Sequence, residues 1–300
     1  MFNKKTRRLS PGIHTAAVTP FRGGEPDMKA FDRLLSDQLS SRVSGVVVLG
    51  TTGEAPTVTE KERDALVRRA AELLSGKKEL TDGCGSNDTA KTVRSVREAA
   101  SQGADFALVV TPYYNRPSQR GLLRHFMTVA EESPLPVIVY NVPSRTGVDI
   151  SAETLAILSA HENIVACKEA SADMQSVAGK LTVGLDFFCG NDALLCQFLA
   201  SGAAGGICVC SNAAPDRTCA IAESAAAGDM DGMRREFYSL YPLIKALGCD
   251  TNPVPIKALL SAEGYMTREV RPPLIPLDDE KRSALLYAAA EAGIYMDQGE

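Results

Sequence analysis

One lysine has the setting of a covalent catalyst. Lys168 closes the apolar run Ile164-Val165-Ala166-Cys167 and is followed by Glu169. A lysine that is removed from water loses its proton more readily, and its free amine can then attack a carbonyl carbon. For the residue taken alone, a structural role also stays open, with the ammonium paired to Glu169 or extended into solvent.

Hydroxyl and guanidinium groups follow other apolar runs of the chain. These groups lie in three motifs, Gly50-Thr51-Thr52-Gly53-Glu54, Thr111-Pro112-Tyr113-Tyr114-Asn115 and Tyr140-Asn141-Val142-Pro143-Ser144-Arg145-Thr146-Gly147. The glycine motif matches neither common phosphate-binding pattern, and by itself it is equally typical of an ordinary turn. If the runs are parallel strands, their carboxyl ends gather the three motifs around Lys168.

The elements that must position these groups form a regular alternation. Eight short apolar segments are predicted strands, at residues 15–19, 45–49, 80–85, 106–111, 137–141, 164–168, 187–190 and 206–209. They are continuously apolar, which is typical of parallel strands covered on both faces, and helical periodicity fills the gaps between them. The pattern predicts an α/β fold, a closed (β/α)8 TIM barrel, with an open doubly wound sheet as the alternative. The third segment is unexpectedly polar, with Thr81 and Asp82 in its middle.

The alternation stops near residue 227. We therefore predict a catalytic (β/α)8 barrel over residues 12–227 and a C-terminal helical region over 228–300, with helices at 230–247, 255–262 and 279–292. No glycine- and serine-rich linker separates the two parts, so we expect the helices to pack on the barrel.

Composition excludes several classes of protein. The 300 residues are 45% hydrophobic and 23% charged, which is ordinary for a globular chain, and the net charge of −5 argues against a nucleic-acid partner. No apolar run approaches the roughly 20 residues of a membrane span, and no apolar segment follows the basic N-terminus as in a secretory signal. The eight cysteines include no C-x-x-C pair. We expect reduced thiols, no metal site and a cytoplasmic location.

Five motifs in one unbroken order resemble the dihydrodipicolinate synthase family, a group of pyruvate-dependent class I aldolases. They are the three motifs above, the second extended through Arg116-Pro117, together with Lys168-Glu169-Ala170 and Asn252-Pro253-Val254-Pro255-Ile256-Lys257. The resemblance runs from about residue 12 to about residue 276. It implies the same fold, a TIM barrel with a C-terminal helical region.

The resemblance also implies a reaction and the residues that perform it. Lys168 forms a Schiff base with pyruvate, and the resulting enamine attacks L-aspartate 4-semialdehyde to give 4-hydroxy-tetrahydrodipicolinate, in lysine and diaminopimelate biosynthesis. The iminium serves as the electron sink, so no metal or other cofactor is implied. Tyr140 transfers protons, and Thr52 links it to Tyr114, which in the family enters from a neighbouring subunit. The family thus implies a homo-oligomer, a dimer at least and commonly a tetramer.

Four further positions are implied to bind the substrates. Arg145 holds the carboxylate of the semialdehyde with its forked guanidinium. Thr51 contacts the pyruvate end, together with backbone groups near Gly190 and Ile207. The sequence Asn191-Asp192 departs from the acidic pair that the family usually carries after the glycine, so only Gly190 supports the role at that place.

Regulation by lysine is expected to differ from that of sensitive relatives. Asn87 and Tyr113 match two residues that bind the inhibitor in those enzymes. Lys91 stands where a glutamate neutralises the inhibitor's amino group, and Glu60 and Arg63 replace residues that are histidines in some sensitive enzymes. Two ammonium groups in one small site repel each other, so we predict weak or absent inhibition.

Two other functions remain as alternatives. A related pyruvate-dependent aldolase or dehydratase, similar to N-acetylneuraminate lyase, acts on a sugar acid and generally lacks the arginine found here at 145. A non-catalytic paralogue that senses a keto acid would keep the fold and lose turnover.

Overall fold

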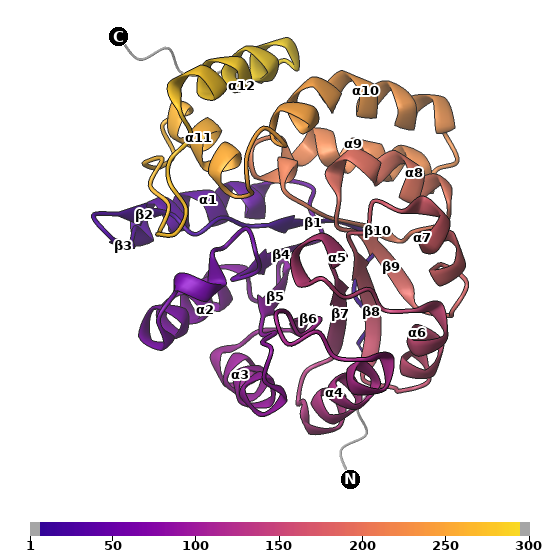
Figure 1. Ribbon diagram of the computed structural model, residues 1–300. Coiled ribbons are helices and arrows are strands. Elements are labelled where there is room, and N and C mark those ends of the chain that lie inside the picture. The colour runs from indigo at the N-terminus through magenta and orange to yellow at the C-terminus, as the bar shows by residue number, and fades with distance from the viewer. Residues whose placement is uncertain (1–6, 295–300) are drawn as a thin grey trace.

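Eight parallel strands close into a barrel in the computed structural model, which describes residues 7–294 (Figure 1). In barrel order the strands are β1 (Gly12–Ala16), β10 (Gly205–Cys208), β9 (Asp186–Cys189), β8 (Ile164–Glu169), β7 (Val137–Asn141), β6 (Phe106–Val110), β5 (Glu79–Gly83) and β4 (Gly45–Val48). Because β1 pairs with both β10 and β4, the sheet has no edge. The predicted TIM barrel is confirmed, and the open sheet is excluded.

The first strand begins three residues earlier than predicted. Ala17, Val18 and Thr19 are as buried and apolar as a strand, but they continue past the barrel as a loop. The backbone N–H of Val18 donates to Asn212 Oδ1 at 3.2 Å, and Thr19 Oγ1 donates to the carbonyl of Gly53 at 2.7 Å. The backbone N–H of Ala17 still donates to the carbonyl of Val47 at 2.9 Å, so side-chain and loop contacts replace the strand ladder only at Val18 and Thr19. Hydrophobicity alone could not reveal this end of the strand.

Helices surround the barrel and cover its outer face (Figure 1). They are α1 (Met28–Ser40), α2 (Glu60–Leu74), α3 (Thr89–Gln102), α4 (Gln119–Glu132), α6 (Ala152–Ser159), α7 (Met174–Lys180), α8 (Leu195–Ala200) and α9 (Pro215–Ala226). The short helix α5 (Pro143–Thr146) follows β7 at the barrel opening, and the 3₁₀ turns are η1 (Ala55–Thr57), η2 (Asp192–Leu194) and η3 (Cys210–Asn212). The capping box of Thr59 and Glu62 starts α2. A two-stranded hairpin, β2 (Phe21–Arg22) with β3 (Glu25–Pro26), was not predicted.

Strand alternation divides the buried side chains into two cores. Phe106, Ile138, Tyr140, Phe188 and Ile207 belong to a cluster that also includes Val47 and Ala166, on the inner side of the strands. The larger cluster packs the other side of the strands against the helices. Successive side chains of a strand point to opposite sides of the sheet, so they alternate between the barrel interior and the helix layer.

The two carboxylates of the polar third strand, Glu79 and Asp82, have hydrogen-bond donors from outside the strand. The Glu79 carboxylate accepts hydrogen bonds from Ser10, at 3.1 Å from its backbone N–H and 2.9 Å from its hydroxyl. The fully buried Asp82 is paired with Arg63 of α2, whose guanidinium also donates to the carbonyl of Gly83 at 3.1 Å. Burial raises the pKa of the Asp82 carboxyl, and Arg63 opposes that shift. Each carboxylate of this strand thus has a donor, whereas Asp82 Oδ1 and the Thr81 hydroxyl are buried without a hydrogen-bond partner among the described residues.

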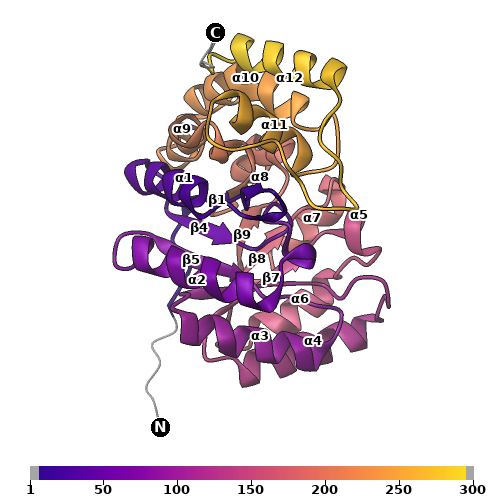
Figure 2. The same ribbon diagram turned by 90° about the vertical axis from the view of Figure 1, so that its left-hand side faces the viewer.

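The C-terminal helices α10 (Met230–Ala246), α11 (Val254–Ala262) and α12 (Asp279–Glu291) lie close to their predicted positions. α10 packs on α9, and α12 packs on both α10 and α11. Figure 2 shows the three helices together on one side of the barrel, opposite α3 and α4. Within residues 7–294 no strand follows β10, and none of the helices is long and apolar enough to cross a membrane.

Candidate active site

Lys168 and Tyr140 lie side by side inside the barrel. They are register partners on the adjacent strands β8 and β7. The lysine is 6% exposed, and its Nζ lies 4.4 Å from the centroid of the tyrosine ring. This contact has the geometry of a cation–π interaction with the face of the tyrosine ring. The amine is therefore buried beside a hydroxyl-bearing side chain.

Gly190 makes room for the lysine side chain. A Cβ at this position would lie 2.9 Å from Lys168 Cε and 3.1 Å from its Cγ, closer than packed carbon atoms approach. Ile207, which is 1% exposed, belongs to the same interior cluster as Tyr140. The structure thus places Gly190 against the lysine, and Ile207 in the apolar interior that it shares with Tyr140.

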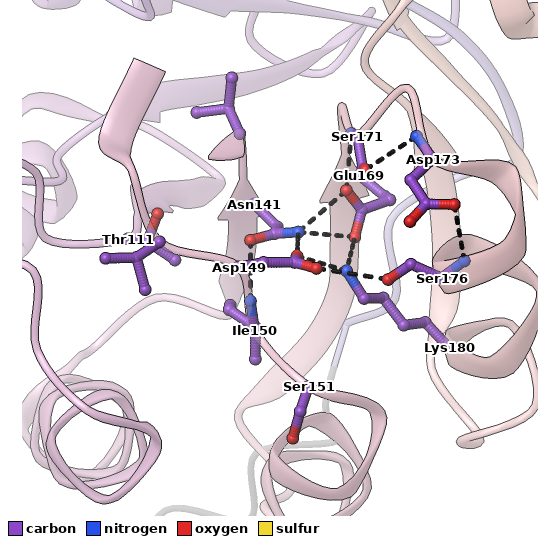
Figure 3. A network of polar contacts seen from close by, with 12 residues as sticks. Thr111, Asn141, Asp149, Ile150, Ser151, Glu169, Ser171, Asp173, Ser176 and Lys180 are labelled. Atoms are coloured by element: carbon purple, nitrogen blue, oxygen red, sulfur yellow. Dashed lines mark hydrogen bonds and ion pairs between the residues drawn. The ribbon is translucent and has the colours of Figure 1, made fainter. Parts of the chain in front are cut away.

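Glu169 does not pair with Lys168. It points to the opposite side of β8, where its Oε2 lies 3.1 Å from Nζ of Lys180 (Figure 3). The amide of Asn141 donates to both carboxylate oxygens of Glu169, at 2.9 and 2.8 Å. Lys180 also contacts Asp149 at 2.5 Å, and these two acidic neighbours outweigh burial and raise the pKa of Lys180. The network in Figure 3 joins β7, β8 and α7 behind Lys168, with the ammonium of Lys180 between the carboxylates of Glu169 and Asp149.

The loop after β4 carries Thr51 and Thr52 at the barrel mouth. Glycine is required at position 53, since a Cβ there would lie 2.8 Å from the backbone nitrogen of Leu49. The backbone N–H of Glu54 donates to the carbonyl of Thr51 at 3.1 Å, which closes the turn. Thr52 is buried, and its Oγ1 accepts a hydrogen bond from Asn252 Nδ2 at 2.9 Å.

Arg145 lies in the short helix α5 that follows β7. Its side chain is exposed, and its guanidinium donates to the backbone carbonyl of Asn252 at 3.2 Å. Asn252 therefore contacts both Arg145 and Thr52. It is the residue that sequence reasoning missed, although the motif beginning at Asn252 offered a signal.

Tyr114 stands apart from the other predicted site residues. It is 89% exposed, and its backbone has a left-handed φ of 70°. Neighbouring Tyr113 is also exposed, at 38%. Large exposed aromatics in a fixed, unusual backbone conformation are typical of a surface that meets another molecule.

Asp192 fixes the loops beside Gly190 and Ile207. Its carboxylate accepts from the backbone N–H groups of Val209, at 2.9 Å, and of Cys210, at 2.7 Å. Asp192, the one acidic residue of the Asn191-Asp192 pair, thus ties the loop after β9 to the loop after β10. The contact satisfies two backbone N–H groups where β10 ends.

The thiols and acidic groups of the described chain form no metal centre. No group of three or more histidine, cysteine or acidic side chains within residues 7–294 could hold a metal ion. All eight cysteines are free thiols, and burial raises the pKa of those at 84, 167, 189, 208 and 210. Such thiols are poor nucleophiles, so Lys168 is the stronger candidate for covalent chemistry.

These features define a class of protein: a (β/α)8 barrel with a buried lysine amine inside the barrel and hydroxyl and guanidinium groups at its mouth. Residues 9–292 match the model of the dihydrodipicolinate synthetase family. The chain belongs to this family.

Named relatives agree with this assignment along nearly the whole chain. The 4-hydroxy-tetrahydrodipicolinate synthase of Thermotoga neapolitana is 42% identical over 290 residues, covering 94% of this chain and 99% of the relative. The crystal structure of dihydrodipicolinate synthase from Thermotoga maritima has a TM-score of 0.94 at 39% identity, with 96% of this chain and 100% of the other covered. A dihydrodipicolinate synthase variant described as monomeric matches with the same TM-score at 38% identity, covering 96% of this chain and 98% of the variant.

Proposed function

We propose that this chain condenses pyruvate with L-aspartate 4-semialdehyde to give 4-hydroxy-tetrahydrodipicolinate, the reaction named for its relatives. Membership of the family makes the chain a lyase of lysine and diaminopimelate biosynthesis. The observation that carries the proposal is the buried Lys168, which lies against the ring of Tyr140 and has no ion pair with a carboxylate within residues 7–294.

The proposed reaction begins with attack of Lys168 Nζ on the keto carbon of pyruvate. Water leaves as the iminium forms, and the iminium draws electrons from the methyl group, which loses a proton to give an enamine. The enamine carbon bonds to the aldehyde carbon of the semialdehyde, whose oxygen takes up a proton. The semialdehyde nitrogen then attacks the iminium carbon and releases Lys168, which closes the ring. The iminium is the electron sink throughout, so we propose that no cofactor is needed.

Protons are carried in this proposal by tyrosine and threonine hydroxyls. Tyr140 is buried next to the amine, which suits a group that donates and accepts during imine formation and cyclisation. Thr52 links it to Tyr114 of a second copy of the chain. The exposure of Tyr114 supports this role, since its hydroxyl is free to enter a neighbouring subunit. We propose a homo-oligomer, a dimer at least and a tetramer in the complete form.

The substrates are proposed to bind at opposite ends of the site. Arg145 holds the carboxylate of the semialdehyde, and its exposed position at the mouth fits a group that captures an incoming anion. Thr51 and the backbone near Gly190 and Ile207 hold pyruvate beside the lysine. We place the enzyme in the cytoplasm, where its eight free thiols stay reduced.

An assay with several acceptor aldehydes tests the proposal. With pyruvate present, the enzyme is expected to consume L-aspartate 4-semialdehyde, and Arg145→Ala is expected to raise the KM for the semialdehyde with a smaller effect on pyruvate. Turnover of a sugar acid in place of the semialdehyde would instead support an N-acetylneuraminate lyase-like enzyme. Pyruvate binding without turnover of any acceptor would support a sensor.

A further inference from the structure

The segment before α11 reaches from the C-terminal helices into the active site. Its residue Asn252 makes two contacts with predicted site residues that lie far from it in sequence. The side-chain amide donates to Thr52 Oγ1 at 2.9 Å, and the backbone carbonyl accepts from the Arg145 guanidinium at 3.2 Å. One residue therefore connects the loop after β4 with the helix after β7.

A buried ion pair holds this segment against the loop of Thr52. Lys257, five residues after Asn252, lies with its Nζ 2.6 Å from Glu54 Oε1, and both side chains are almost fully buried. The other oxygen of Glu54 accepts from the backbone N–H of Arg271 at 2.9 Å. A buried pair with these extra hydrogen bonds tolerates little displacement. The distance between the Asn252 amide and Thr52 is thus fixed by the fold.

Burial of the Asn252 side-chain amide has an energetic cost, because one of its polar atoms has no partner among the described residues. Its Oδ1 is buried and has no hydrogen-bond partner among the described residues. Most buried polar atoms are paired, and an unpaired acceptor costs free energy that an apolar residue would avoid. The single side-chain hydrogen bond of Asn252, the one to Thr52, is the interaction that offsets this cost.

We propose that Asn252 is a positioning residue that sets the direction of the Thr52 hydroxyl. The amide N–H occupies an acceptor position on Thr52 Oγ1, so the threonine's own proton must point elsewhere and is free to pass toward Tyr140. The inference rests on the proposed function, in which Thr52 is part of the proton path. The contact with Arg145 also ties this path to the group that captures the acceptor aldehyde.

Two substitutions of Asn252 separate its effect on the direction of the Thr52 hydroxyl from the effect of its side-chain size. Asn252→Asp keeps the size of the side chain but replaces the donor by a carboxylate, which accepts the Thr52 proton and withdraws it from the path. Asn252→Ala leaves the hydroxyl free to rotate. Both keep the backbone carbonyl that Arg145 contacts. We expect kcat to fall by about tenfold or more in Asn252→Asp and by less in Asn252→Ala, as loss of a proton-transfer group predicts.

The double variant Thr52→Val/Asn252→Asp tests whether Asn252 acts through Thr52. We expect its kcat to equal that of Thr52→Val alone, because residues that act as one unit are not additive. Asn163→Asp is the matched control. The amide of Asn163 donates to the backbone carbonyls of Ala130, Ser133 and Leu135 ahead of β7, at 3.0 to 3.1 Å, so this substitution should lower the melting temperature and leave kcat unchanged.

Borohydride reduction with pyruvate distinguishes failure of this inference from failure of the proposed function. An adduct in both wild type and Asn252→Asp, with the expected order of kcat values, supports both. An adduct with kcat in Asn252→Asp equal to or above that of Asn252→Ala overturns the inference alone, as do losses that multiply in the double variant. Absence of an adduct in the wild type overturns the proposed function and the inference with it.

Discussion

Three lysines are buried within residues 7–294, and they differ in what surrounds the ammonium group. Lys180 lies between Glu169 and Asp149, and Lys257 lies 2.6 Å from Glu54. Lys168 has a tyrosine ring at 4.4 Å and no carboxylate in ion-pair range within residues 7–294. Two of these three lysines therefore have carboxylate partners, and Lys168 has none within the described residues.

The comparison separates lysines that hold the fold together from one that is available for chemistry. Removing one partner of a buried ion pair leaves an isolated charge in the interior. A buried amine that no carboxylate holds is free to contact the carbonyl carbon of a substrate and to act as a nucleophile. Substitutions at the two kinds of lysine should thus affect different measurements.

The largest effect is expected on activity at Lys168. Lys168→Met keeps most of the volume and removes the amine, so kcat should fall by about 10³-fold or more, as for loss of a covalent nucleophile. The free energy of unfolding should change little, because no ion pair is broken. Steady-state assays and urea unfolding at one protein concentration check this. A variant that kept a tenth of the activity would show that the nucleophile lies elsewhere.

The reverse result is expected at Lys257. Lys257→Met leaves Glu54 buried without its partner, which should lower the free energy of unfolding by about 3–5 kcal/mol. Adding Glu54→Gln should restore much of that loss, because the isolated charge is then gone. Lys281, whose ammonium lies 2.7 Å from Asp250 at an exposed site, is the matched control, and its change to Met should have no measurable effect. Equal losses at the two lysines would contradict the comparison.

The buried imidazole of His125 is expected to make the stability of the protein depend on pH. Burial lowers the pKa of His125 from 6.5 to about 4. As the pH falls, the unfolded chain therefore takes up a proton on His125 before the folded chain does. The contribution of neutral His125 to the free energy of unfolding is fully present above pH 6.5 and is lost as the pH falls toward 4, by at most about 3 kcal/mol. Urea unfolding across this range should show a shallower fall in His125→Gln than in the wild type. Parallel pH profiles would contradict the assignment.

The smallest effect concerns inhibition by lysine. Because Lys91 is expected to repel the amino group of the inhibitor, added lysine should have little effect on the rate, and Lys91→Glu should increase sensitivity. A titration of both forms checks this prediction. Half-inhibition of the wild type at sub-millimolar lysine would contradict it.

Sequence patterns predicted the barrel because its strands are buried on both faces. The run at 137–141 matches β7 residue for residue, and the capping box at Thr59 starts α2 as expected. The predicted end of the first strand was wrong because Ala17 and Val18 are buried beyond the end of the strand. Hydrophobicity does not distinguish such buried loop residues from residues of a strand. The polar strand β5 depends on Ser10 and Arg63, partners that only the folded chain reveals.

The candidate site was predictable only in part. The position of Lys168 at a strand end, and its adjacency to Tyr140, follow from the order of the parallel strands. The roles assigned to the site residues stay predictions, as does the division of the chain at residue 227; these residues are Lys168, Tyr140, Thr51, Thr52, Tyr114, Arg145, Gly190 and Ile207. Asn252 could not be found by strand-end reasoning, since it comes from the C-terminal region and meets Thr52 only after the chain has folded.

The central claim is that Lys168 is the covalent nucleophile. The direct measurement is incubation with pyruvate, reduction with borohydride and mapping of the modified peptide by mass spectrometry, in the wild type and in Lys168→Ala. We predict a reduced pyruvyl adduct on Lys168 of the wild type and none in the variant. An unmodified wild-type chain, or an adduct on Lys180 or Lys257, would contradict it.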